Sequence, residues 1–95
     1  MLRHIVCYRL KPDKKYLVEE AKLRLLSLKC IPGVKNIEVG IDEKKSERSF
    51  DIALTVDFES KADYKIYDKH EKHQPVRMFM HSIFETSVSV DYQRD

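Results

Sequence analysis

Apolar residues occupy every second position in four segments of the chain, which is the pattern of β-strands. The clearest segment is 50–58, where the alternate positions are all large and apolar. They are Phe50, Ile52, Leu54, Val56 and Phe58. Three further strands are predicted at residues 3–10, 34–41 and 86–92. In segment 3–10 both alternating sets contain apolar side chains, so both faces of this strand must be covered.

A different spacing predicts a helix between the first two strands. Apolar residues recur every three or four positions over residues 14–30, as they do on one face of an amphipathic helix. They are Val18, Ala21, Leu25 and Leu28. Pro32 and Gly33 follow and end the helix, because neither residue continues a helix well.

Two shorter helices are predicted between the third and fourth strands. Ser60 and Asp63 resemble a capping box, which begins a helix over residues 61–70. Pro75 suits the first turn of another helix, whose apolar residues point inward. They are Val76, Phe79, Met80 and Ile83. The order of elements is therefore strand, helix, strand, strand, two helices and strand.

This order is the split βαβ, or ferredoxin-like, arrangement. We predict an α+β protein with a single domain over residues 1–95, an antiparallel four-stranded sheet and helices on one face. The face without helices still carries Ile5, Cys7 and Ala53, or the opposite set in another register. A domain of this size buries only about 60 to 65% of its unfolded surface, so a second copy would add core. We therefore predict a homodimer through the sheet face, which closes a dimeric α+β barrel.

Composition excludes several classes of protein. The 95 residues contain 18 Lys and Arg against 16 Asp and Glu, with the two signs interleaved and no basic, aromatic sheet face, so no nucleic-acid partner is expected. No apolar run approaches the roughly 18 to 20 residues of a membrane span, and charged Arg3 interrupts any signal peptide. We expect a cytoplasmic protein without a membrane partner. Cys7 and Cys30 are predicted to be buried, reduced thiols and not a disulfide.

Six short motifs occur in order along nearly the whole chain. They are MLRHIV at 1–6, IPGV at 31–34, SFDIAL at 49–54, FES at 58–60, HEKH at 70–73 and VDY at 90–92. The ordered set resembles the stress-responsive A/B barrel domain family, called Dabb. The resemblance implies a dimeric α+β barrel of ferredoxin-like protomers. The family is functionally mixed, since it includes plant stress-associated proteins, bacterial members without assigned activity and a polyketide cyclase branch.

The cyclase branch suggests where a site would lie. In that branch a tyrosine at the end of a helix and a histidine six residues later form the catalytic pair, in a pocket that also contains a first-strand histidine. The matching positions are Tyr67, His73 and His4, although Glu71 replaces the proline that commonly follows the first histidine of the pattern. The resemblance thus implies a barrel that binds a small molecule or acts in stress response. The alternative is an acid/base enzyme, such as a cyclase or isomerase of a small carbonyl compound.

Tyr67 and His73 are suited to such chemistry. Histidine has a reference pKa near ~6.5 and can remove a proton next to a carbonyl at neutral pH, so His73 is the predicted base. Tyrosine has a reference pKa near ~10 and stays protonated, so Tyr67 is the predicted hydrogen-bond donor to the developing oxyanion. Asp91 is the predicted acceptor that orients His73. The predicted pocket lining is His4, Tyr8, His70 and Asp91.

Each of these side chains also has an interpretation without chemistry. His70 and His73 can cap helix ends while Tyr67 packs with its hydroxyl in water, and His4 can be a buried, hydrogen-bonded histidine. A metal site would need His4 as a third ligand, but the helix breaks between His70 and His73 and no cysteine pair has ligand spacing. We therefore predict no metal and no cofactor. A purely structural dimer, whose side chains fill the pocket, is the third alternative.

Overall fold

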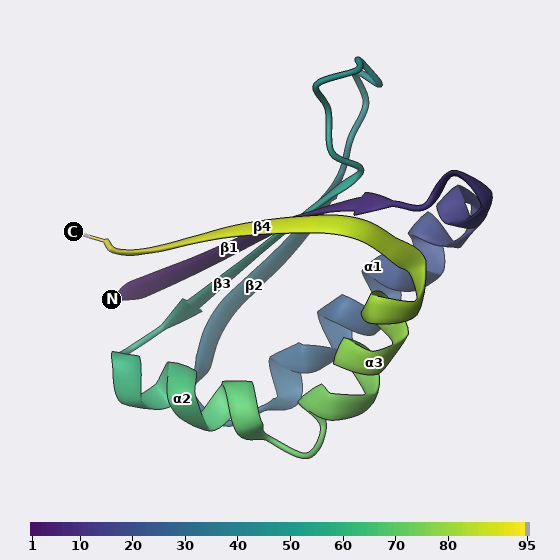
Figure 1. Ribbon diagram of the computed structural model, residues 1–95. Helices are drawn as coiled ribbons and strands as arrows, with labels where there is room; N and C mark the ends of the chain where they lie inside the picture. The colour runs from purple at the N-terminus through teal and green to yellow at the C-terminus, as the bar shows by residue number, and fades with distance from the viewer. Residues whose placement is uncertain (95) are drawn as a thin grey trace.

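The computed structural model describes residues 1–94 and shows an α+β fold with a sheet covered on one face by helices (Figure 1). The strands are β1 (Leu2–Leu10), β2 (Val34–Ile41), β3 (Ile52–Phe58) and β4 (Phe84–Gln93). The helices are α1 (Val18–Leu26), α2 (Lys61–Lys69) and α3 (His73–Ile83), with the 3-10 segments η1 (Pro12–Leu17) and η2 (Ser27–Cys30) on either side of α1. Neighbouring strands are antiparallel, in the order β2-β3-β1-β4. The predicted ferredoxin-like protomer is confirmed.

Most predicted elements differ at their ends by one or two residues, and the largest difference is in the first helix. The helix predicted over 14–30 is α-helical only in α1, and tight 3-10 turns, which are common at helix termini, continue it on both sides. β3 begins two residues later than predicted. Just before it, the Asp51 carboxylate accepts a hydrogen bond from the Leu10 backbone N–H at 2.7 Å and bridges the strand ends. Within residues 1–94, no helix is long and apolar enough to cross a membrane.

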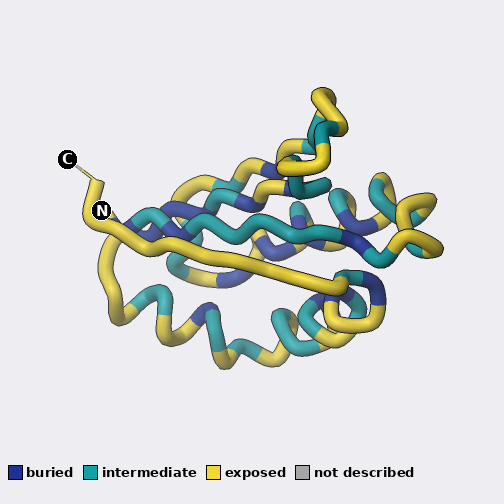
Figure 2. The backbone as a smooth tube through the Cα atoms, turned by 45° about the horizontal axis from the view of Figure 1, so that its top comes forward, coloured by how far each residue is buried: buried dark blue, intermediate teal, exposed yellow. Residues whose placement is uncertain are grey.

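The core lies between the helix layer and one face of the sheet. The register pairs His4 with Val56 and Val6 with Leu54, so alternate residues of β1 and β3 face the helices together. The buried apolar residues are Leu2, Leu10, Ala21, Leu25, Leu28, Ile31, Val39, Ile52, Leu54, Val56, Phe58, Tyr67, Val76, Met80 and Ile83. Figure 2 shows these buried positions along the inner strands and on the helix layer. His4 is therefore buried beneath the helices.

β4 has the opposite polarity from the other strands. Its register pairs Asp91 with His4 and Ser89 with Val6, so its polar residues face the helix layer. Its apolar residues face away from the helices. They are Val88, Val90 and Tyr92, which are 50, 54 and 41% exposed. β4 is exposed along almost its whole length (Figure 2), so the helix layer leaves its inner face open.

The helix-free face of the sheet contains a buried ion pair. Asp57 is 1% exposed, and Arg3 donates to both of its carboxylate oxygens, at 2.8 and 3.0 Å. Arg94 approaches the same carboxylate to 3.4 Å. The hydrogen bonds from Arg3 are the main reason why the pKa of Asp57 is below its ordinary value. The pair ties β1, β3 and the end of β4 together.

The predicted burial of both cysteines is wrong. Cys7 is half-buried, because the register places it on the helix-free face, opposite Ala53 and Val88. Cys30 is exposed at the last position of η2. Both are free thiols within residues 1–94. The segment between β2 and β3 projects on the same side as this face, away from the helices (Figure 1).

Two local contacts position the start of α2. The Ser60 hydroxyl accepts a hydrogen bond from the Asp63 backbone N–H at 3.3 Å, which confirms the predicted cap. Gly33 has a φ of +93°, and a Cβ at this position would lie 3.0 Å from the Cβ of Asp63. A side chain there would be strained both in backbone conformation and in space, so the turn before β2 requires glycine. This close approach fixes α2 against the turn.

Candidate functional site

A hollow of about 220 Å³ lies between the β1–β4 edge of the sheet and the helix layer. Its apolar lining is Val6, Leu25, Val76, Met80 and Phe84. Its polar lining is His4, Tyr8, Tyr64, Asp68, His73, Arg77, His81, Ser87 and Ser89. The space exists because the two serines of β4 are small and polar where the other strands carry large apolar side chains. A second hollow, of about 340 Å³, lies beside Phe50 on the helix-free face and contains none of the predicted site residues.

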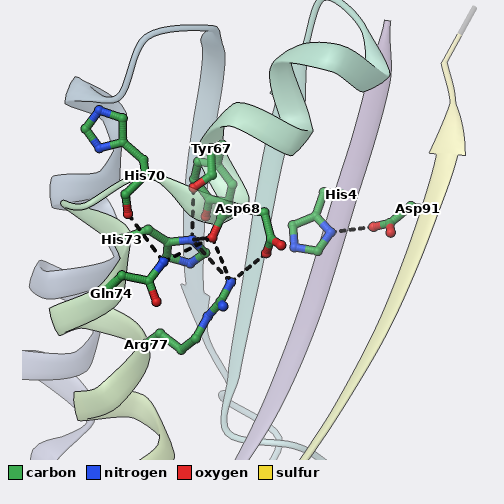
Figure 3. A network of polar contacts seen from close by, with 8 residues as sticks. All are labelled: His4, Tyr67, Asp68, His70, His73, Gln74, Arg77 and Asp91. Atoms are coloured by element: carbon green, nitrogen blue, oxygen red, sulfur yellow. Dashed lines mark hydrogen bonds and ion pairs between the residues drawn. The ribbon is translucent and has the colours of Figure 1, made fainter.

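Aromatic rings from three elements gather beside the first hollow. The ring centres of Tyr67 and His73 are 4.5 Å apart, and those of His4 and Tyr64 are 5.0 Å apart. The rings of His4 and Tyr67 are 6.5 Å apart. The structure therefore brings together the three side chains that the resemblance singles out, from β1, α2 and α3 (Figure 3).

Tyr67 lies behind the lining and not in it. Its side chain is 1% exposed, and its ring packs edge-on against Phe58, with the ring centres 4.9 Å apart. Its hydroxyl is not in water, as one interpretation of the sequence had it, but is buried without a hydrogen-bond partner among residues 1–94. Burial raises the pKa of Tyr67 above its ordinary value, so the hydroxyl stays protonated and remains a donor. Tyr8 does line the hollow, and burial raises its pKa to about 12.

His73 has a defined tautomer. Its Nδ1 lies 3.1 Å from the carbonyl oxygen of Tyr67 and 3.2 Å from that of Asp68 (Figure 3). Carbonyl oxygens only accept hydrogen bonds, so Nδ1 carries a proton. The Nη2 of Arg77 also lies 3.5 Å from Nδ1, but a protonated Nδ1 cannot accept from it, and the two shorter carbonyl contacts decide the assignment. Burial, and next the positive charge of Arg77, lower the pKa of His73 below its ordinary value. At neutral pH His73 is therefore uncharged, and its Nε2 can accept a proton.

The structure corrects the predicted partner of Asp91. Its carboxylate hydrogen-bonds Nδ1 of His4 and not His73 (Figure 3). The cause is the strand register, because Asp91 and His4 are paired residues of β4 and β1 whose side chains share one face. A carboxylate only accepts, so Nδ1 of His4 is the donor, and no hydrogen bond among residues 1–94 uses its Nε2. His4 and His73 are thus held through the same ring nitrogen by different partners.

The structure places His70 and Asp91, both predicted to line the pocket, outside the lining of the hollow. His70 is the residue after α2, where its Nδ1 accepts a hydrogen bond from the Lys72 backbone N–H at 3.1 Å. This contact holds the His70 ring in the turn between α2 and α3, so His70 does not join His4 in a shared site. In the part of the chain that the structure describes, no three His, Cys, Asp or Glu side chains lie close enough to hold a metal ion.

Sequence analysis did not single out Arg77, Asp68, Ser87 or Ser89. The Nη2 of Arg77 donates to the Asp68 carboxylate at 2.5 Å and to the Asp68 carbonyl at 3.1 Å. The available signal was spacing, since Arg77 follows His73 by four residues and such pairs share a helix face. For the two serines, the signal was that they alternate with valines in the last strand.

His73→Asn tests the protonation state of His73. Asparagine can replace Nδ1–H as a donor but does not titrate. Because the folded state lowers the pKa of His73, the folded protein binds fewer protons than the unfolded chain once the pH falls below about 6.5. The free energy of unfolding, measured with urea, should therefore fall more steeply for the wild type than for the variant between about pH 7 and pH 5. Equal slopes would contradict the assigned state.

Solved structures of other proteins share this fold. A dimeric protein of unknown function and ferredoxin-like fold from Bacteroides fragilis NCTC 9343 is 27% identical, with a TM-score of 0.86, over 98% of this chain and 95% of that one. A Dabb family protein from Mesorhizobium loti is 25% identical, with a TM-score of 0.76, over 99% of this chain and 96% of that one. A protein from Arabidopsis thaliana is 18% identical over 100% of this chain and 96% of that one, with a TM-score of 0.86, and shows the fold alone. No curated protein matches this chain.

Comparison with protein families agrees with the ordered motifs. The family described as Stress Responsive A/B Barrel Domain, or Dabb, matches residues 2–94. The match covers nearly the whole chain and includes every element of the sheet and of the helix layer. The resemblance found in the sequence is therefore confirmed, and this chain belongs to the stress responsive A/B barrel domain family.

Proposed function

We propose that this chain forms a homodimer in which each protomer binds a small organic molecule in the hollow beside β4. The observation that carries the proposal is the lining, in which apolar side chains surround a few convergent polar groups, as in most ligand pockets. His4 and His73 belong to this lining with Nδ1 already engaged, which leaves Nε2 of each for a ligand. The volume of about 220 Å³ is below the ~300 to 1,000 Å³ typical of drug-sized ligands, so the expected ligand is about the size of a single ring.

The homodimer is supported by the outward face of β4. Val88, Val90 and Tyr92 leave apolar surface in water in a single protomer. A second sheet packed on this face would cover them together with Ile5 and Cys7 of β1. The similar protein from Bacteroides fragilis is described as dimeric. In such a dimer the hollow remains on the other side of each sheet, beneath the helices.

Val90→Asp tests this interface. The variant would bury an unpaired carboxylate from each protomer, so the dissociation constant of the dimer should rise by on the order of 100-fold. Light scattering over a micromolar dilution series measures the change. Ile66→Asp is the matched control, because Ile66 is 53% exposed against 54% for Val90 but lies on α2. If Val90→Asp dissociates at the same dilution as Ile66→Asp, the sheet face is not the interface.

Ser89→Phe tests binding in the hollow. Ser89 lines the hollow from an exposed edge strand, so a phenylalanine there would fill the space without disturbing the core. Acetophenone, a neutral aromatic ketone, is the probe, and NMR of the His4 and His73 ring signals follows its binding. Its dissociation constant should rise at least about tenfold in Ser89→Phe and clearly less in Ser89→Ala, which removes one hydroxyl group but leaves the space open. The proposal fails if the wild type does not bind the probe or if Ser89→Phe binds it equally well.

A second candidate function is acid/base chemistry on a carbonyl compound. It is favoured by His73, whose uncharged Nε2 can remove a proton next to a carbonyl group. The enolate oxygen that then forms needs a hydrogen-bond donor. Tyr67 is the proposed donor, because buried hydroxyl groups nearly always have a partner and this one has none among residues 1–94. Since Tyr67 lies behind the lining, this role requires the lining side chains to shift when the substrate binds. The short distance between the two rings supports a joint role.

Hydrogen exchange at the methyl group of acetophenone in D2O, followed by proton NMR, tests this second function. His73→Asn should slow the exchange by at least ~100-fold, as expected when a general base is removed. Tyr67→Phe should slow it by a similar factor, on the order of 100-fold, because it removes the donor to the enolate oxygen. His70→Asn is the control, since His70 lies outside the hollow. Exchange that continues unchanged in His73→Asn would remove the catalytic role and leave the binding function intact.

A further inference from the structure

We infer that the ligand of this hollow is a small carboxylate, held by the guanidinium group of Arg77, with its apolar part against the apolar lining. The inference rests on the proposed binding function and names the class of ligand. Arg77 lines the hollow from α3, one turn after His73. Neither the sequence motifs nor the similar proteins assign it a role.

Arg77 brings a permanent positive charge to the lining. Its Nη2 is engaged with the side chain and the backbone carbonyl of Asp68. No hydrogen bond among residues 1–94 uses its Nη1 or its Nε. Both of these atoms are donors in a guanidinium group and neither can accept, so they remain for the oxygens of a ligand.

The guanidinium group is also held in place. Arg77 reaches from α3 to the end of α2, where Figure 3 shows it between His73 and Asp68. The Asp68 carbonyl accepts a further hydrogen bond from the Gln74 side-chain amide at 3.3 Å, so this contact region is cross-linked several times. A group that is already ordered loses less rotamer entropy when it binds an anion. Arg77 is therefore a positioned binding group, unlike a mobile surface cation.

The charge of Arg77 changes the pKa values of other groups that line the hollow. It contributes to the lowered pKa of His73, after burial. It also opposes the rise in pKa that burial gives Tyr8 on β1. At Tyr64 on α2 the negative charges of Asp68 and Asp91 act in the other direction and outweigh it. A carboxylate in the part of the hollow between Tyr8 and His73 therefore lies within the field of the guanidinium group.

A cation fits this lining less well than an anion. Asp68, the acidic side chain of the lining, already pairs with Arg77, and Asp91 pairs with His4. Asp68 also repels an anion, so the preference rests on the donors of Arg77 that no hydrogen bond among residues 1–94 uses, which can bind a carboxylate but not a cation. The lining also contains four hydroxyl groups that can donate to ligand oxygens. They belong to Tyr8, Tyr64, Ser87 and Ser89.

The apolar lining defines the remainder of the ligand. Its residues come from the sheet and from the helices, and a purely inorganic anion would leave them uncovered. A carboxylate attached to one ring or to a short branched chain fits both this surface and the volume of about 220 Å³. The hollow therefore suits a small amphipathic acid.

Benzoate and benzamide test the inference, because they are nearly equal in shape and differ in charge. The wild-type protein should bind benzoate about tenfold more tightly than benzamide, as expected for hydrogen bonds to a charged group. Arg77→Gln and Arg77→Met should both abolish this preference. Lys65→Gln removes the same charge from an exposed position of α2 and should keep it. Calorimetric titration measures the affinities, and thermal unfolding shows which variants are folded.

The possible results separate the inference from the function on which it rests. Equal affinity of the wild type for the two probes would overturn the inference and leave the binding function in place. Binding of neither probe would overturn both. A preference for benzoate that survives in a folded Arg77→Gln or Arg77→Met protein, or that is lost equally in Lys65→Gln, would show that Arg77 is not the recognition group. If Arg77→Gln does not fold, Arg77→Met provides the test, because the long methionine side chain suits the neighbouring apolar lining.

Discussion

The register of β4 against β1 is the constraint on which both proposed surfaces depend. Side chains of a strand alternate between two faces, so the pairing of Asp91 with His4 sets the direction of every side chain in β4. In this register Ser89 faces the helices and Val90 faces away from them. A shift by one residue would exchange the two faces. Valines would then close the hollow, and serines would occupy the face proposed for the dimer.

The same register separates the two histidines of the hollow. His4 is held by Asp91, a residue of the neighbouring strand, whereas His73 is held by backbone carbonyl groups at the end of α2. The two rings are therefore positioned by different parts of the fold. A change in β4 alters the orientation of His4 alone, and a change in the turn between α2 and α3 alters that of His73. The proposed base depends on helix packing and not on the sheet.

Local patterns were sufficient to predict the elements but not their contacts. β2 has the bounds that its alternation predicts, and Ser60 caps α2 as its spacing predicts, because both depend on residues close in sequence. The partner of Asp91 depends on which strand lies beside β4 and in which register, and neither is contained in the alternation. The exposure of Cys30 and the contact of Arg77 with α2 likewise depend on how distant elements pack. The motifs singled out three aromatic side chains that the structure does bring together. They could not show that one of the three, Tyr67, lies behind the lining of the hollow.

The inner face of β4 is a place where this chain does not maximise its stability. A small domain gains roughly 25 cal/mol for each Å² of apolar surface that it buries, and valine is readily accommodated in this strand, as Val88 and Val90 show. The chain nevertheless has serine and aspartate where its core could extend, and behind the lining of the hollow Tyr67 has a buried hydroxyl without a partner among residues 1–94. Departures from the rules of core packing concentrate at functional sites, where a ligand supplies the missing contacts. These departures lie beside one hollow and an anchored arginine, and this concentration is the physical reason for proposing a binding site there.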